Sequence, residues 1–365
     1  MTMSNDLRST VCAAEDLLPG GEMSAEPQPL RLLNRKPERA LSVGPAKSDV
    51  RRRLFAFYRL QLTRVWTHLS EGIRRSSAGR AYGRHLHATI CRTADRQQYV
   101  ATFFLRNRPE LQLICRLLGR KPLGSTVDLS VLACSKGAEV YSIAWAIRSA
   151  RPDLQLRIHA LDISQEIVEF AERGVYSRES LHVSRKWVTD QNLTNLDRVT
   201  WNTHLHQQTP IFERVSDAEL HDLCEVAGDR ASIRPWLRDG ITWLCGDAGD
   251  PALVDRLGSQ DIVVANRFLC HMQPVVAETT LRNIVRLVKP GGHLFVSGVD
   301  LDVRTRVARL MGWRSVPELL REVYEGDFSL LDGWPLGYWA QEPFNENRRD
   351  WKTRYASVFQ IGEAQ

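Results

Sequence analysis

From residue 127 onward, short apolar runs alternate with segments in which apolar residues recur every three or four positions. The first pattern is typical of buried strands and the second of amphipathic helices. Strands alternating with helices predict a mainly parallel, doubly wound α/β sheet. The stretch 354–361 predicts a closing strand, antiparallel at or beside the sheet edge. The predicted strands are 128–133, 156–161, 241–245, 261–265 and 293–297, and the predicted helices are 138–151, 166–173 and 276–287.

Two regions that precede residue 127 do not follow this alternation of strands and helices. Residues 1–48 are rich in Pro, Gly, Ser and mixed charge without a persistent apolar period, which predicts a disordered tail. From about residue 48 to residue 87, apolar side chains recur at spacings of three and four, which predicts an amphipathic helix rich in arginine. We therefore divide the chain into a tail (1–48), a basic helical N-terminal segment (49–122) and an α/β domain (123–365).

Two parts of the α/β domain interrupt or follow the predicted sheet. Residues 177–240 form a polar insertion with one helical piece near 217–224, and no strand pattern is visible within it. The insertion is expected to form a cap or a layer of loops near the strand ends. Residues 300–365 are expected to supply the C-terminal helices and the closing strand.

The net charge of +6 is unevenly distributed. Residues 51–92 hold ten arginines and one acid, so this Arg-rich segment carries +9 and the rest of the chain sums to −3. Such a segment fits an anionic partner, either an acidic protein or an anionic membrane surface, or else a solvated helix face. No recognition motif for nucleic acid accompanies it, so a nucleic-acid partner is not expected.

Cysteine spacing and hydropathy argue against a disulfide-linked, metal-binding or membrane-spanning protein. The seven cysteines include no CxxC pair, and His204, His206 and Cys224 are too loosely spaced for metal ligands, so neither disulfides nor a metal site are predicted. No apolar run approaches the ~18 residues of a membrane span, and the first residues lack the apolar core of a signal peptide. These features predict a cytoplasmic protein. Attachment to the inner membrane through the Arg-rich segment stays open.

The stretch VLACSKGAEVYSIAWAI, residues 131–147, joins the first predicted strand to the first helix. In a doubly wound sheet, ligands bind beyond the carboxyl ends of the strands. Small residues let a ligand approach the backbone, and Gly137 adopts conformations that other residues resist. The pattern is not GxGxxG, so a dinucleotide phosphate site is not expected. Glu139 falls in the first helical turn, where it either contacts a ligand or simply stabilises the helix dipole.

An acid, Asp162, ends the second predicted strand in IHALDIS, twenty-five residues after Gly137. An acid at this place can hydrogen-bond ribose hydroxyls, and its alternative role is to cap the following helix. A loop of small residues without a phosphate cradle, followed by this acid, suits a nucleoside with little or no phosphate. S-adenosylmethionine (SAM) meets this description.

Four segments in order, ACSKGAEVYSIA, ALDISQEIVEFAERGVYS, VVANRFLCHM and LVKPGGHLFVSG, resemble successive motifs of the CheR-type methyltransferases. These are SAM-dependent enzymes that esterify glutamate side chains of chemotaxis receptors. The resemblance runs from about residue 101 to residue 299, and the ordered set is far more specific than any one motif. It implies a Rossmann-like class I SAM-dependent methyltransferase fold, with a mainly parallel seven-stranded sheet, and SAM as the cofactor.

The resemblance also implies which residues bind the cofactor. In TFFLRNRPEL, Thr102 and Arg106 match a family segment that contacts SAM, although Val100 replaces the usual asparagine. Glu139 matches the acid that reaches the methionine portion of SAM, and Asp162 matches the ribose acid. The other candidates are Gly137 in the first loop, Asp247 and Ala248 near the adenine, and Asn266 and Arg267 after the fourth strand.

Arg106 and His271 are the candidate catalytic residues, and His271 stands where the family has tyrosine. An ionised carboxylate is already a nucleophile, so its methylation mainly requires that it be held in line with the methyl group. A guanidinium can bind one carboxylate oxygen and leave the other free to attack. The alternative role of Arg106 is a structural ion pair. His271 could orient the acceptor or a hydroxyl group by a hydrogen bond, or be an ordinary half-buried histidine.

Three functions fit these residues. The first is a carboxyl O-methyltransferase that esterifies a small or lipidic carboxylic acid, such as a hydroxy fatty acid that becomes a methyl ester signal. The second is a protein-glutamate O-methyltransferase that acts on a chemotaxis-like receptor or another acidic protein. The third is a non-catalytic SAM-binding sensor, against which the retention of Glu139, Asp162 and Arg106 argues.

Departures from the family favour the first of these functions. The basic N-terminal segment does not match the family's receptor-docking domain, and the family's small β-subdomain is not visible in the insertion. The Trp-rich stretch GWPLGYWAQEPF, residues 333–344, has no family counterpart. It would either line an apolar acceptor pocket or cover the core.

Overall fold

The computed structural model describes residues 46–94, 96, 100–178, 211–331 and 333–362. The chain divides into two units, Met1–Val50 and Arg51–Gln365, and only the start of one helix is described in the first unit. The tail predicted for residues 1–48 thus lies outside the described residues, apart from its last positions, which are helical.

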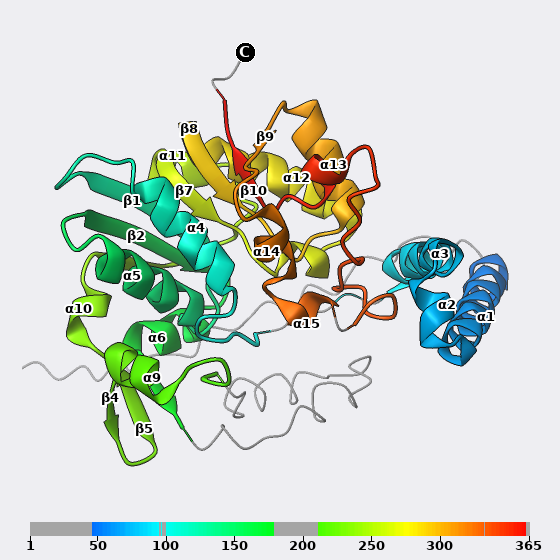
Figure 1. Cartoon of the computed structure of the whole chain (residues 1–365), viewed down its shortest axis with the longest axis horizontal. Helices are drawn as coiled ribbons and strands as arrows, with labels where there is room; N and C mark the ends of the chain where they lie inside the picture. Colours follow the sequence, from blue (N-terminus) through cyan, green and yellow to red (C-terminus); the bar gives the residue numbers. More distant parts are fainter. Residues whose placement is uncertain (1–45, 95, 97–99, 179–210, 332, 363–365) are drawn as a thin grey trace, which may run out of the picture. The chain divides into compact units, whose positions relative to one another are not determined.

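A seven-stranded sheet forms the centre of the second unit (Figure 1). Five neighbouring strands pair in parallel, and the last two are antiparallel to their neighbours. This confirms the predicted Rossmann-like fold with a mainly parallel seven-stranded sheet. In spatial order the strands are β6 (Ile241–Cys245), β2 (Gln155–Asp162), β1 (Thr126–Leu132), β7 (Gln260–Val264), β8 (Val288–Phe295), β10 (Val358–Gln360) and β9 (Arg314–Ser315).

Helices cover both faces of this sheet. Successive side chains of a strand point to opposite faces, and in β7 Ile262 and Val264 join one apolar cluster while Val263 joins another. The first cluster includes side chains of α4 (Arg108–Leu118) and α5 (Ala138–Ala150). The second includes side chains of α12 (Pro274–Ile284) and α13 (Leu301–Leu310).

The strand order reverses direction between β1 and β7, because β2 and β6 follow on one side of β1 and β8 lies beyond β7 on the other. The loops after β1 and β7 therefore lead away from each other. In doubly wound sheets this is the point where ligands bind, at the carboxyl ends of the strands. The fold thus places the loop that starts at Ala133 beside the loop that starts at Ala265.

Helix α4 lies before the predicted boundary between residues 122 and 123 and packs on the sheet. Leu113, Ile114 and Leu118 of α4 are buried in the same cluster as strand β1. The sequence pattern groups α4 with the basic segment before it, but its apolar face packs on the sheet. The part of the chain that builds the α/β core therefore begins before residue 108.

The insertion contains a small sheet that the sequence pattern does not reveal. Strands β3 (Val175–Ser177), β5 (Arg230–Ile233) and β4 (Cys224–Ala227) pair antiparallel in that order. Strands of three or four residues are too short to show a clear alternation. The helix predicted near 217–224 is confirmed as α9 (Asp217–Leu223). Residues 179–210 lie outside the described part.

Two predicted strands are displaced along the chain. Strand β8 covers Val288–Phe295 and not 293–297, because its early residues continue the parallel pairing with β7 from Gln260. The closing strand is only Val358–Gln360, antiparallel as predicted. Arg354, the first residue of the predicted stretch, still belongs to helix α16 (Trp351–Arg354), and residues 355–357 are irregular. The two-residue strand β9 was not predicted.

The Arg-rich segment is not one continuous helix. It forms α1 (Ala46–His68), the short α2 (Glu71–Arg75) and α3 (Ser77–Thr93). The side chain of Ser76 accepts a hydrogen bond from the Gly79 amide and so caps α3. A Cβ at Gly79 would meet the Ile73 carbonyl oxygen at 1.9 Å, so only glycine permits this close return of the chain.

The return packs α3 against α1 on one side only. Tyr82 donates a hydrogen bond to the Leu62 carbonyl (2.9 Å), and its ring stacks on Trp66, which is buried. Other apolar residues of the predicted amphipathic face, including Leu54 and Phe55, remain exposed. Among the described helices, none is both long and apolar enough to cross a membrane.

Candidate functional site

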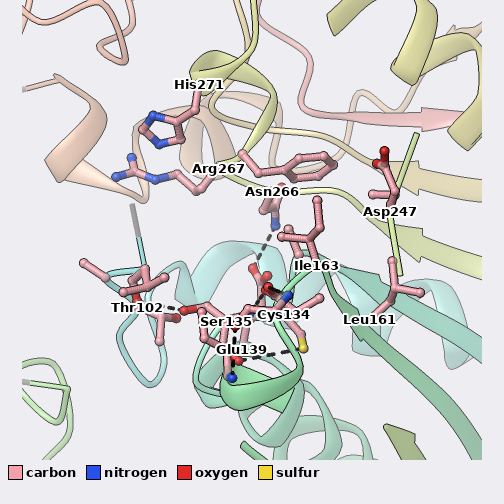
Figure 2. Close-up of a pocket in the computed structure, with 18 of the residues that line it drawn as sticks. Thr102, Cys134, Ser135, Glu139, Leu161, Ile163, Asp247, Asn266, Arg267 and His271 are labelled. Atoms are coloured by element: carbon pink, nitrogen blue, oxygen red, sulfur yellow. Dashed lines mark hydrogen bonds between the residues drawn. The ribbon is translucent and has the colours of Figure 1, made fainter. Parts of the chain in front are cut away.

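A cavity lies at the carboxyl ends of β1, β2, β6 and β7, at the reversal of the strand order (Figure 2). About 960 Å³ of space free of protein atoms lies within its outline, part of it open to solvent. Nine of the ten predicted site residues line it. They are Thr102, Arg106, Glu139, Asp162, Asp247, Ala248, Asn266, Arg267 and His271.

The loop after β1 is turned sharply to form the floor of this cavity. Ala133 and Ser135 both have positive φ angles, 54° and 50°, in a region that side chains with a Cβ rarely occupy. The turn is held because the Cys134 amide donates to the Leu161 carbonyl (2.9 Å) and the Ser135 hydroxyl donates to the Val100 carbonyl (2.7 Å). Strain of this kind is typical of functional sites.

Gly137 is the one predicted site residue that does not line the cavity. It precedes α5 with a φ of 83°, and a Cβ there would lie 3.0 Å from both Ala171 and Trp243. Its role is therefore to turn the chain into the helix in a crowded place. The prediction that Gly137 contacts the cofactor is not supported by its position.

Asp162 supports the loop after β1 and also faces the cavity. Its carboxylate accepts hydrogen bonds from the Ser135 amide (2.8 Å) and the Ser164 amide (3.3 Å). Burial raises the pKa of Asp162, although these amides oppose that effect. The cap of α6 (Gln165–Arg173) is Ser164, whose side chain accepts from Ile167, so the alternative role of Asp162 as a helix cap is wrong.

The loop after β6 supplies a third wall of the cavity. Asp247 accepts a hydrogen bond from the Gly249 amide (2.7 Å), and Ala248 is buried beside it. Ile163 lines the cavity from the end of β2 and is largely exposed. Apolar side chains with one carboxylate at their edge form a surface suited to the flat face and polar edge of a purine.

Glu139 and Asn266 meet across the crevice. The Asn266 side-chain amide comes from the loop after β7 and donates to Glu139 at the start of α5 (2.9 Å; Figure 2). The same amide nitrogen donates to Glu110 of α4 (2.8 Å), a buried residue that does not line the cavity. Sequence reasoning did not select Glu110. Its place within the matched segment TFFLRNRPEL was the only signal.

A cluster of cations lies on another side of the cavity. Arg106 and Arg267 line the cavity. Asp327 does not line it, but its carboxylate forms ion pairs with Arg267 (3.3 Å) and Arg214 (3.1 Å). Burial, followed by the repulsion of Arg267, lowers the pKa of Arg106 to about 10, so the guanidinium stays charged at neutral pH. Neither Arg214 nor Asp327 carried a signal in the sequence.

Arg106 is held as a partly exposed cation and not as half of a direct ion pair among the described residues. One of its terminal nitrogens donates to the Ala101 carbonyl (2.9 Å), and the guanidinium lies 5.3 Å from the ring centre of Phe103. A structural ion pair, the alternative role considered for Arg106, therefore describes Arg214 better than it describes Arg106.

His271 lies at the rim, on the short 3-10 helix η3 (Leu269–His271). Its Nδ1 atom is 2.9 Å from the Tyr338 hydroxyl, which comes from the Trp-rich stretch. Arg96 anchors this rim, because its guanidinium donates to the Cys270 and Met272 carbonyls (2.8 and 2.9 Å) and pairs with Asp300. The remainder of the Trp-rich stretch mainly covers other parts of the protein, and Trp334 packs edge-on against Trp66.

The lining fits SAM part by part. Asp162 can accept hydrogen bonds from ribose hydroxyls, and the Asp247 wall can hold the adenine. Glu139 is a half-buried carboxylate that lacks a direct cationic partner among the described residues, and an ammonium group would supply one. No group of three or more potential metal ligands occurs in the described ranges.

Comparisons with known proteins agree with this site. The family described as "CheR methyltransferase, SAM binding domain" matches residues 101–208, and the family described as "Methyltransferase domain" matches residues 213–296. The first range contains the residues at the ends of β1 and β2, and the second contains those after β6 and β7. All nine cavity residues that were predicted fall within the two ranges.

Two relatives are similar to parts of the chain. The probable biofilm formation methyltransferase WspC of Pseudomonas aeruginosa is 25% identical over 207 residues, which cover 55% of this chain and 42% of that protein. Phosphoethanolamine N-methyltransferase 1 of Triticum aestivum is 38% identical over 56 residues, 15% of this chain and 11% of that protein. The chain thus matches less than half the length of these relatives.

Solved methyltransferase structures align only loosely. The magnesium protoporphyrin IX methyltransferase of Synechocystis PCC 6803 aligns with a TM-score of 0.28 at 12% identity, covering 57% of this chain and 71% of that one. An O-methyltransferase family protein from Burkholderia thailandensis aligns with a TM-score of 0.33 at 12% identity, covering 87% and 72%. Scores this low carry no argument of their own, and the fold rests on the strand order and directions.

The motifs around the cavity, the order of the strands and the two family matches lead to the same conclusion. Residues 101–208 are similar to the CheR SAM-binding domain and residues 213–296 to a methyltransferase domain, and together they line a cavity that fits SAM as the cofactor.

Proposed function

We propose that the protein is a SAM-dependent carboxyl O-methyltransferase whose acceptor is a small or lipidic carboxylic acid. One observation carries the choice of a carboxylate: two arginines line the cavity, and while Arg267 contacts the buried Asp327, Arg106 forms no direct ion pair among the described residues. That aspartate faces a third guanidinium as well, from Arg214. An acceptor carboxylate that enters the cavity would give Arg106 a direct ionic partner.

The two arginines suit two different carboxylates. SAM carries a carboxylate on its methionine portion, and the proposed acceptor carries another. Arg267 comes from the same loop as Asn266, so it is placed to serve the methionine end of the cofactor. Arg106, beside Thr102 and the rim, is placed to hold the acceptor. A planar guanidinium binds one oxygen firmly and fixes the direction of the other.

SAM supplies the methyl group in an electrophilic sulfonium form. The free carboxylate oxygen of the acceptor bonds to this methyl carbon, and the electron pair of the broken S–CH₃ bond remains on sulfur. The products are a methyl ester and S-adenosylhomocysteine, and no proton has to be transferred. The protein's contribution is then to orient the acceptor and exclude water, which lowers the entropic part of the barrier.

A small or lipidic acceptor is supported by the composition of the rim. Phe268 and Met272 line the cavity next to His271, and the Trp-rich stretch brings Tyr338 to the same place. Apolar walls with a few polar groups are the usual surroundings of a small ligand. The histidine and tyrosine hydroxyl at the rim would suit an acceptor that carries a hydroxyl group.

A protein glutamate is the second candidate, and one finding favours it. The family's small β-subdomain is not visible in the sequence pattern, but the antiparallel sheet of β3, β5 and β4 stands in that part of the chain. The Arg-rich segment also offers charge for an acidic partner. Its α1 residues Leu54, Phe55 and Phe57 are exposed beside arginines, which suits an anionic partner with an apolar surface.

Labelled methyl transfer separates these acceptors. The purified protein is incubated with methyl-labelled SAM and with either a lipid extract or a protein extract, and each fraction is tested for label that mild base releases as methanol. Base-labile label in the lipid fraction supports the proposal. Label confined to protein supports the second candidate, and the absence of label in both, with intact SAM binding, supports a sensor.

A matched pair of variants shows that the label depends on this site. Arg106→Ala should remove it. Arg120→Ala, which removes a largely exposed arginine in the loop before β1, should not.

A further inference from the structure

Glu110 is a buried acid beside the cofactor site that does not touch the cavity. Its side chain belongs to the first turn of α4, and the residue is only 4% exposed. One carboxyl oxygen accepts a hydrogen bond from Asn266, and the other has no hydrogen-bond partner in the described part of the chain. A buried carboxylate with one orphaned oxygen is costly unless it is neutral.

The Asn266 side chain lies between Glu110 and Glu139, and a backbone amide determines which way this side chain is oriented. The Asn266 side-chain oxygen accepts from the Ser297 amide (2.9 Å) and from the Ser297 hydroxyl (2.8 Å). Since a backbone amide can only donate, the NH₂ group of Asn266 must face the two acids. The NH₂ group then donates one hydrogen to Glu110 and the other to Glu139.

No cation forms a direct ion pair with either carboxylate among the described residues. Arg106 and Arg267 act on the pair from a distance, and Asp327, which is paired with Arg214, acts on it with a negative charge. Burial, followed by the repulsion of Glu139, raises the pKa of Glu110 to about 8. Burial also raises the pKa of Glu139, but Asn266 and Arg106 oppose the effect there.

We propose that Glu110 and Glu139 share one proton, which Glu110 holds, so that only Glu139 presents a negative charge to the α-ammonium group of SAM. Glu110 is then a positioning residue: in its neutral form it fixes Asn266, and Asn266 fixes the carboxylate of Glu139. Glu110 is the proton holder because it is the more buried of the two and has no access to the cavity. The inference rests on the SAM site described above.

The ligand-free protein tests the shared proton without any cofactor. Glu110→Gln replaces a neutral carboxylic acid by a neutral group of the same shape. A pKa raised on folding means that the protonated form contributes stability that is full below the unfolded value, about 4.5, and is lost as pH rises through about 8. The melting temperature of Glu110→Gln should therefore rise relative to that of the parent protein between about pH 5 and pH 8, and the difference should stay constant above pH 8.

The matched control is Glu322→Gln on helix α14 (Leu320–Glu325), since Glu322 is exposed. Its melting temperature should keep a constant offset from that of the parent over the same pH range. A Glu110→Gln variant that fails to fold, or that is less stable than the parent at pH 6.5, would show that Glu110 is ionised and would overturn the proposal.

Binding of S-adenosylhomocysteine at pH 7 tests which acid carries the charge. Calorimetry should find that Glu139→Gln weakens binding at least tenfold, whereas Glu110→Gln keeps it within about threefold. The reverse order, or a tenfold loss in both variants, contradicts the proposal. If the parent protein itself does not bind, the cofactor assignment fails, while the pH dependence of stability still decides the protonation of Glu110.

Discussion

The Nδ1 atom of His271 lies 2.9 Å from the hydroxyl oxygen of Tyr338, although the two residues are 67 positions apart. The motif resemblance places His271 where CheR-type methyltransferases have tyrosine, and here a phenol hydroxyl reaches this rim from a different part of the chain. The ring of Tyr338 also lies under the guanidinium of Arg96, which anchors the η3 loop. The pair thus joins the Trp-rich stretch to the cavity.

We predict that Tyr338→Phe lowers methyl transfer about fivefold and leaves affinity for S-adenosylhomocysteine unchanged. The variant keeps the ring but removes the hydroxyl that orients His271, and an orienting hydrogen bond is worth about 1 kcal/mol. Turnover and calorimetry are the measurements. Tyr82→Phe, which loses a hydroxyl within the Arg-rich segment, is the control. Equal turnover in both variants would remove Tyr338 from the site.

Arg106 and Arg267 should separate turnover from cofactor binding. Arg106→Ala is expected to lower methyl transfer 10²-fold or more, about 3 kcal/mol of transition-state stabilisation, with little change in SAM affinity. Arg106→Lys should rescue poorly because an ammonium lacks the planar fork. Arg267→Ala should instead weaken SAM binding. If the two effects were exchanged, Arg106 would be the cofactor ligand.

Asp162 should contribute to cofactor affinity through charged hydrogen bonds. Asp162→Ala is expected to weaken SAM binding by about 1–3 kcal/mol. Because Asp162 also accepts from the Ser135 amide, part of this loss could come from the loop. Asp162→Asn can still accept that amide but loses the charge, so calorimetry on both variants separates the two roles. Unchanged affinity in both would exclude Asp162 from the ribose site.

Asp327 should make the stability of the protein depend on acid pH. Burial alone would raise its pKa, but Arg267, Arg106 and Arg214 outweigh this and lower it to about 2. A lowered pKa contributes stability that is present above the unfolded value and is lost as pH falls through the folded value. Asp327→Asn should thus cost about 2 kcal/mol at pH 7 and much less near pH 2. Denaturation at several pH values provides the measurement, and a constant difference would contradict it.

The Arg-rich segment should act in partner binding and not in cofactor binding. Reversing the exposed Arg64 and Arg75 to glutamate should weaken association with an acidic protein or anionic vesicles, and the effect should shrink at high salt, since exposed charges are screened over about 8–10 Å. Affinity for S-adenosylhomocysteine should not change. Binding to partners that is independent of salt and of these charges would favour a solvated helix face.

Much of the fold and of the cofactor site was open to prediction because the relevant signals are local. Apolar runs of five to eight residues define strands such as β2, and a helical period after a loop of small residues defines α5. The ends of parallel strands gather at one edge of a sheet, so the sequence pattern predicts that Glu139 and Asp162 lie there, and the family resemblance adds Asn266.

Tertiary structure alone decided the features that depend on distant pairing. The strands of the small antiparallel sheet are too short to show a period, and they exist because they pair with one another. Gly137 has the composition of a ligand loop, but the packing of Ala171 and Trp243 against it gives it a structural role.

Charge balance also depends on tertiary structure. No sequence motif assigns a role to Glu110, Asp327 or Tyr338, and each becomes significant through a partner more than 60 residues away. Local sequence determines the type of an element because backbone preferences and periodicity act over a few residues. Burial, the pairing of charges and the fit of a rim depend on which segments the fold brings together, and those are properties of the packed chain.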